Sequence, residues 1–175
     1  MFGIRYHTDL VIEPIFPFPR RIIARKGDAF YMENQDTLRL LRECDAGAKM
    51  GVASIDGVLE NVKNQELHDL LAQSRKRHEQ LGNRTMELLS ALGDAGKEPP
   101  AMAKGMAAMK SGMKMMMGNP DQQAADLITD GCGMGVKSLS RYLNQYPNAQ
   151  PQAQKVTREL IGEEESLAKA VRPYL

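Results

Sequence analysis

Two cysteines, Cys44 and Cys132, carry the most reactive side chains of this 175-residue chain. Their spacing does not match the paired cysteines of a zinc module, and one possible pair does not make a disulfide scaffold. No basic residue stands at a fixed spacing that would mark either thiol as a nucleophile. We therefore expect two buried thiols, which suit a reducing cytoplasm.

Glycines recur four residues apart in two places, Gly47 with Gly51 and Gly131 with Gly135. The second pair lies within Gly-Cys-Gly-Met-Gly, which could cradle a phosphate, but no strand precedes it and its spacing differs from the nucleotide-binding fingerprints. A glycine inside a helix costs about 1 kcal/mol relative to alanine. Since a structural gain should offset this cost, we expect these glycines to let two helices approach closely.

Methionines recur at helical spacing between the two halves of the chain, at Met102, Met106, Met109, Met113 and Met116. The lysines of this stretch fall off the methionine stripe, which predicts an amphipathic helix. Such a stripe can bind a soft metal such as Cu(I) or an adaptable protein partner. We favour a packed crossover helix, because methionine fills irregular gaps well.

The charge of the chain is balanced, with 23 lysines and arginines against 22 aspartates and glutamates. This balance gives no electrostatic reason to expect nucleic acid or an anionic membrane as a partner. No apolar run approaches the roughly 18 residues that span a bilayer, and the start of the chain lacks a secretory signal pattern. We expect one cytoplasmic domain, with no nucleic acid and no membrane bound.

Residues 1–31 differ in composition from the rest of the chain. They hold six of the nine aromatic residues, and three prolines between positions 14 and 19 interrupt any helix or central strand. The segment could be a docking arm or an unstructured leader. We favour a third interpretation, that it is not natively translated. Lys26-Gly27-Asp28 can be encoded by AAA-GGA-GAT, which contains a bacterial ribosome-binding sequence upstream of Met32.

Beyond Met32 the apolar residues follow alternate steps of three and four, which predicts four helices. The apolar seams cover about 38–62, 67–92, 129–146 and 156–174. Asn64 can cap the second helix, and Gly93 can end it. Asn119 can cap the third helix, with Gln122 placed to complete a capping box.

An internal repeat relates the first and third predicted helices. A shift of 84 residues aligns Gly47–Ser54 with Gly131–Ser138, matching two glycines, a methionine, a valine and a serine. The apolar seams coincide at the same shift. The sequence therefore predicts two duplicated helical hairpins.

Two antiparallel hairpins joined by a long crossover resemble the ferritin-like superfamily, in particular its small rubrerythrin-like members of unassigned function. The resemblance covers Asp36 to Arg172. It implies an all-α fold over residues 32–175, a four-helix bundle of two antiparallel hairpins with a crossover helix. In metal-binding members, the first and third helices each offer a glutamate, and the second and fourth each carry Glu-x-x-His. These groups hold iron or another transition metal.

This chain departs from the metal-binding pattern in both motifs. The second helix has Arg75-Lys-Arg-His78, and the fourth has Glu163-Glu-Glu-Ser166. A permanent cation at Arg75 opposes a divalent ion and instead neutralises carboxylates. In place of the di-metal centre we therefore expect a core polar layer of Asp45, Arg75, His78 and Glu163.

The alternative is a single metal ion held by Asp45, His78, Asp130 and Glu163. A lone histidine on an apolar seam is more often a hydrogen-bonded core residue, so we favour no cofactor and no catalytic residue. The resulting hypothesis is a non-catalytic bundle with a degenerate di-metal site, acting through a homodimer or another protein partner. A metal-binding protein or oxidoreductase with an unusual site is the competing hypothesis.

Overall fold

Four long helices make up the computed structural model, which describes residues 26–96 and 118–175. They are α1 (Lys26–Leu59), α2 (Gln65–Ala91), α4 (Pro120–Gln145) and α5 (Pro151–Ala170), followed by a short 3-10 helix over Arg172–Tyr174. Neither described range contains a strand. The prediction of an all-α fold with four bundle helices is therefore confirmed for these two ranges.

The helix ends follow from the local sequence. Asn64 accepts a hydrogen bond from the backbone N–H of Leu67 at 3.0 Å, as expected of a cap. Gly93 follows α2 with a φ of +75°, a conformation that glycine adopts without a steric penalty. At the start of α4, Asn119 accepts its hydrogen bond from Asp121, instead of forming the capping box expected with Gln122.

Helix α1 begins at Lys26, before the boundary expected at residue 32. The expectation of an irregular segment was therefore wrong for residues 26–31. The last proline of that segment is Pro19, so none interrupts a helix there. Residues 1–25 lie outside the described residues. The predicted crossover helix and its methionine stripe also lie outside them, within residues 97–117.

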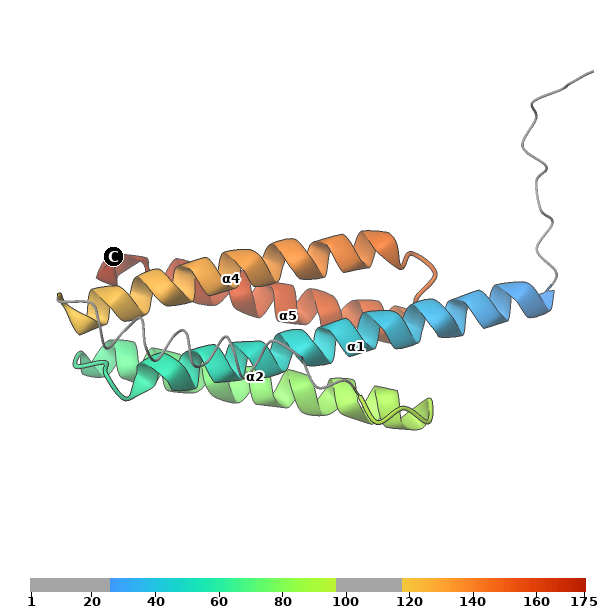
Figure 1. The fold of residues 1–175 in the computed structure, drawn as a ribbon, viewed down its shortest axis with the longest axis horizontal. Coiled ribbons are helices and arrows are strands. Elements are labelled where there is room, and N and C mark those ends of the chain that lie inside the picture. The colour runs from blue at the N-terminus through green and yellow to red at the C-terminus, as the bar shows by residue number, and fades with distance from the viewer. Residues whose placement is uncertain (1–25, 97–117) are drawn as a thin grey trace, which may run out of the picture.

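Followed by its colour in Figure 1, the chain runs along α1, turns back at residues 60–64 and returns along α2. Helix α4 starts at the end of the bundle that holds this turn, and α5 returns to that end. Helix α1 packs against α2 and α4, and α5 packs against α4 and α2. At one end of the bundle, Asp121 accepts hydrogen bonds from the backbone N–H groups of Lys63 at 2.6 Å and Asn64 at 3.1 Å. These bonds join the start of α4 to the turn between α1 and α2.

The hydrophobic core is divided into two clusters along the bundle. One contains Leu41, Leu89, Leu139 and Leu160, and the other contains Ile55, Leu71, Ile128 and Leu167. On α2, the buried Ser74 and His78 fall between residues of the two clusters, and on α5 the buried Glu164 does the same. These three residues therefore form a buried polar layer between two mainly apolar clusters.

Candidate functional site

His78 on α2 is the centre of the polar layer between the two apolar clusters. Its side chain is fully buried, as the sequence predicted for a seam residue. The Nδ1–H donates to the backbone carbonyl of Ser74, one turn earlier, at 2.9 Å. This bond fixes the ring so that Nε2 faces Glu164 of α5, with 3.4 Å between Nε2 and Oε1. That distance is long for a hydrogen bond, so the attraction is mainly Coulombic.

Glu164, and not the predicted Glu163, is the carboxylate that faces His78. Glu164 is 6% exposed and belongs to the buried face of α5. Glu163 lies at the edge of the layer, where its carboxylate accepts hydrogen bonds from Ser74 Oγ at 2.7 Å and Arg77 Nη1 at 3.2 Å. Both glutamates lie at helical spacing from Leu160 and Leu167, so the apolar seam alone could not choose between them.

The internal repeat distinguishes Glu164 from Glu163 as the partner of His78. Helix α1 ends at Leu59 and α4 ends at Gln145, which is 86 positions later. Helix α2 begins at Gln65 and α5 begins at Pro151, which is also 86 positions later. The second hairpin therefore carries two extra residues before its turn. His78 and Glu164 are also 86 positions apart, which makes them equivalent residues of the two hairpins.

Two of the four repeated glycines leave space for this pair. A Cβ atom on Gly51 of α1 would lie 2.3 Å from the His78 ring, and one on Gly135 of α4 would lie 2.9 Å from Glu164 Oε1. A Cβ on Gly47 would make only ordinary contacts, and one on Gly131 would meet nothing within 4 Å. The expectation that all four serve close helix approach was therefore wrong, because Gly51 and Gly135 accommodate polar side chains from the second helix of each hairpin.

Arg75 was placed wrongly in the polar layer. Its side chain is 34% exposed and pairs at the surface with Asp56 of α1 and Glu79 of α2, at 2.5 and 2.7 Å. On α2 it follows the buried Ser74 by one position, and the rotation of about 100° per residue directs it away from the core. Surface pairing also avoids the desolvation penalty of a buried guanidinium.

The two predicted aspartates lie away from His78 and Glu163. Asp45 is buried as expected, but its nearest charge is Lys49, whose Nζ lies 3.1 Å from Oδ2. Six residues of α1, about 9 Å of helix, separate Asp45 from Gly51 at the level of His78. Asp130 is exposed on α4. Within residues 26–96 and 118–175, no group of three or more His, Cys, Asp and Glu side chains is placed to hold a metal ion, so these residues do not fit a di-metal centre.

The charges of the layer perturb its titratable groups. Burial lowers the pKa of His78, but Glu164, the Ser74 carbonyl and Glu163 outweigh burial, so the pKa lies above its ordinary value. Burial raises the pKa of Cys44, and burial together with Glu164 raises that of Cys132. Both cysteines are buried and unpaired, as predicted, and remain protonated thiols rather than nucleophiles.

A groove of about 310 Å³ between α1 and α4 leads down to His78 and Glu164. Its walls are mainly apolar, and Met50 and Met134 at its edges are 48% and 65% exposed. A second groove, of about 620 Å³ between α1 and α2, is lined in part by Asp45 and Lys49 and also reaches His78. The layer is thus a buried proton-holding pair beneath two surface grooves.

Comparisons with protein families, with characterised proteins and with solved structures find no match for this chain. None of the described helices combines the length and the apolar character that crossing a membrane requires.

Replacement of Gly51 by alanine should destabilise the bundle, whereas the same change at Gly131 should stabilise it. The added Cβ at residue 51 would overlap a ring that Ser74 and Glu164 hold in place, which we expect to lower the free energy of unfolding by roughly 1–3 kcal/mol. At residue 131 the helix propensity gain of up to about 1 kcal/mol is unopposed. Urea denaturation at neutral pH measures both effects, and equal gains at the two sites would contradict this account of the glycines.

The stability of the bundle should fall as the pH rises through the folded-state pKa of His78. Because that pKa is raised, the charged histidine contributes stability that is fully present below its unfolded pKa of about 6.5 and is lost at higher pH. We expect His78→Gln to reduce this pH dependence of the unfolding free energy between pH 5.5 and 8.5. His68→Gln removes a surface histidine and serves as the matched control, so an equal reduction there would contradict the assignment.

Proposed function

We propose that this chain is a ferritin-like, rubrerythrin-like bundle in which a histidine–glutamate pair replaces the di-metal centre, and which acts by protein association rather than catalysis. The observation that carries the proposal is the His78–Glu164 pair at the middle of the bundle. It occupies the layer between the apolar clusters where the resemblance would have the metals. The competing metal-binding or oxidoreductase function lacks such a supporting observation.

The course of the chain supports the ferritin-like assignment. We propose that α1–α2 and α4–α5 are antiparallel hairpins. Helix α4 begins at the end of the bundle where Asp121 meets Lys63 and Asn64, whereas α2 ends at the opposite end. Two hairpins connected between opposite ends of the bundle are typical of that superfamily. The two buried thiols suit the cytoplasmic location that we include in the proposal.

The charge balance of the layer supports a metal-free state. Glu164 is neutralised by His78, and Glu163 by Arg77 and by the hydroxyl of Ser74. A di-metal centre instead needs several carboxylates with no cation of the protein beside them. Association is supported by Met50 and Met134, since large apolar side chains exposed beside an apolar groove are typical of interaction surfaces.

The metal-free proposal predicts that protein purified without chelators contains no stoichiometric transition metal. Elemental analysis measures the content directly. Incubation with Fe²⁺, Mn²⁺ or Zn²⁺ should leave the melting temperature unchanged, because an ion that binds only the folded state would raise it. About one ion per chain, lost in both the His78→Ala and Glu164→Gln variants, would instead establish the metal-binding alternative.

A further inference from the structure

The exposed methionines at the edges of the α1–α4 groove are equivalent residues of the two hairpins. Met50 and Met134 are related by the 84-residue repeat, as are three residue pairs that line the same groove: Gly47 and Gly131, Gly51 and Gly135, Ser54 and Ser138. The groove therefore presents the same residue types from its two sides. Because α1 and α4 run in opposite directions, this equivalence implies an approximate local two-fold axis that passes through the groove and points out of the bundle.

The position of this local axis along the bundle follows from the contact between His78 and Glu164. His78 fills the space at Gly51, Glu164 fills the space at Gly135, and the two side chains meet. Gly51 and Gly135 therefore lie at nearly the same level along the bundle, which is also the level of the axis.

A stripe of exposed residues runs along α4 through Met134, which lies at the edge of the groove. Its members are separated by steps of four, three and four, and are Asp130, Met134, Lys137 and Arg141. Asp130 stands five positions before Gly135 and Arg141 six positions after it. At about 1.5 Å per residue, their opposite charges lie roughly 8 and 9 Å from the axis level, on either side.

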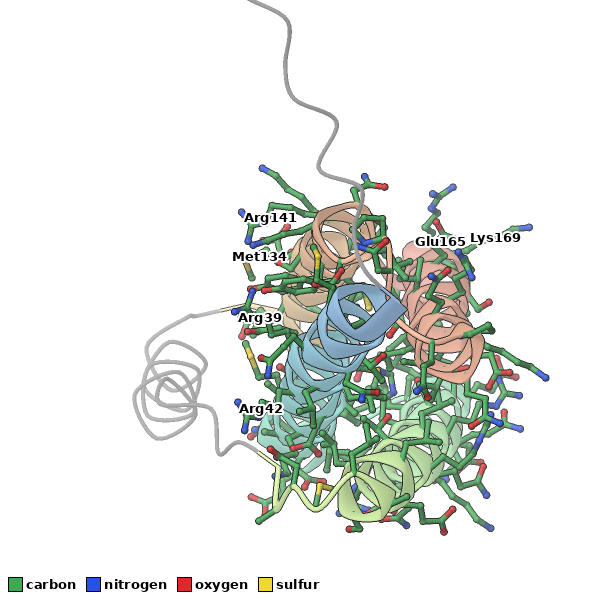
Figure 2. The ribbon with its side chains drawn as sticks, turned by 90° about the vertical axis from the view of Figure 1, so that its right-hand side faces the viewer. Arg39, Arg42, Met134, Arg141, Glu165 and Lys169 are labelled. Carbon is green, nitrogen blue, oxygen red and sulfur yellow. The ribbon has the colours of Figure 1, made fainter. Side chains whose placement is uncertain are left out.

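One side of the bundle carries two residues of this stripe together with basic residues of α1. Figure 2 shows Arg141, Met134, Arg39 and Arg42 pointing to the same side, while Glu165 and Lys169 point to the other. Arg141 also lies against the ring of Tyr142, with 5.4 Å from its guanidinium carbon to the ring centroid. This contact limits the conformations of the arginine and so reduces the entropy lost when it binds a carboxylate.

We propose that a second copy of this chain docks on the α1–α4 groove about a two-fold axis that lies in the plane of the interface, perpendicular to the helices and to the local axis. The α4 helices of the two copies then face each other in opposite directions, so Arg141 of each copy meets Asp130 of the other. Met50 and Met134 of both copies lie in the centre of the interface. This inference rests on the proposed association function and names its partner and its surface.

The charges favour a second copy over another occupant. A two-fold interface brings a surface against itself, so every attractive pair it contains occurs twice. A half-turn about an axis that crosses α4 near residue 135 exchanges the levels of Asp130 and Arg141. Asp130 of one copy therefore faces Arg141 of the other, and these two residues are complementary to themselves. Methionine suits the apolar centre of such an interface, because its flexible side chain adapts to the facing groove.

Sedimentation of the full chain over micromolar to submillimolar concentrations tests the proposal. A dimer of twice 19.4 kDa is expected. Asp130→Arg and Arg141→Glu should each raise the dissociation constant by roughly tenfold or more, since each change makes two attractive pairs repulsive. The double variant should recover most of the lost affinity, because it restores both pairs with their charges exchanged.

Glu165→Arg and Lys169→Glu are the matched controls, since they reverse charges on the other side of the bundle and should leave the dimer unchanged. Circular dichroism verifies that each variant is folded. A wild-type chain that stays monomeric would overturn the self-docking proposal, whatever its metal content. A dimer that ignores both changes on α4 would overturn the proposed surface and leave the association function standing.

The Met50→Glu variant tests whether the groove is covered by a second copy or by a segment of the same chain. If the groove is covered by a second copy, this change should weaken the dimer. If it instead lowers the melting temperature of a monomer and shifts no dimer equilibrium, the groove is covered from within the chain and the proposal is overturned.

Discussion

The charge pair between His78 and Glu164 is the constraint on which the rest of the bundle depends. Two ionisable side chains in a hydrophobic core lose their hydration, at a cost of several kcal/mol for each charge left uncompensated. Each compensates the other only while Nε2 and Oε1 remain within reach, which fixes α2 and α5 in register. The facing helices must then leave room at that level, and Gly51 and Gly135 do so.

The equivalence of positions in the two hairpins accounts for where this pair lies. Equivalent positions in two repeated hairpins meet near the local axis, so identical residues there would bring two like charges together. Two buried carboxylates side by side cannot both ionise without a large penalty, and two imidazoles have the same difficulty. The difference between His78 and Glu164 converts that repulsion into attraction, so the repeat is broken at the position where symmetry would be most costly.

The four helices, and the helix ends marked by Asn64, Gly93 and Asn119, could be predicted from the sequence because apolar spacing and caps are local features. The start of α1 at Lys26 could not. The burial of His78 followed from the same spacing. The direction of Arg75 did not, since a long side chain next to a seam can reach either a core carboxylate or a surface one. Glu163 and Glu164 were equally compatible with the seam, and only the two-residue shift between the hairpins distinguishes them.

Under the proposed function, the residues of the polar layer also determine whether the bundle can bind a metal ion. A metal site depends on carboxylates that are not already neutralised by a cation of the protein. Here His78 pairs with Glu164, and Arg77 pairs with Glu163. An ion entering the layer would have to displace the proton of His78 and leave that carboxylate's partner neutral. Since the core groups are occupied with one another, interactions with other molecules fall to the surface, where the groove and its exposed methionines lie.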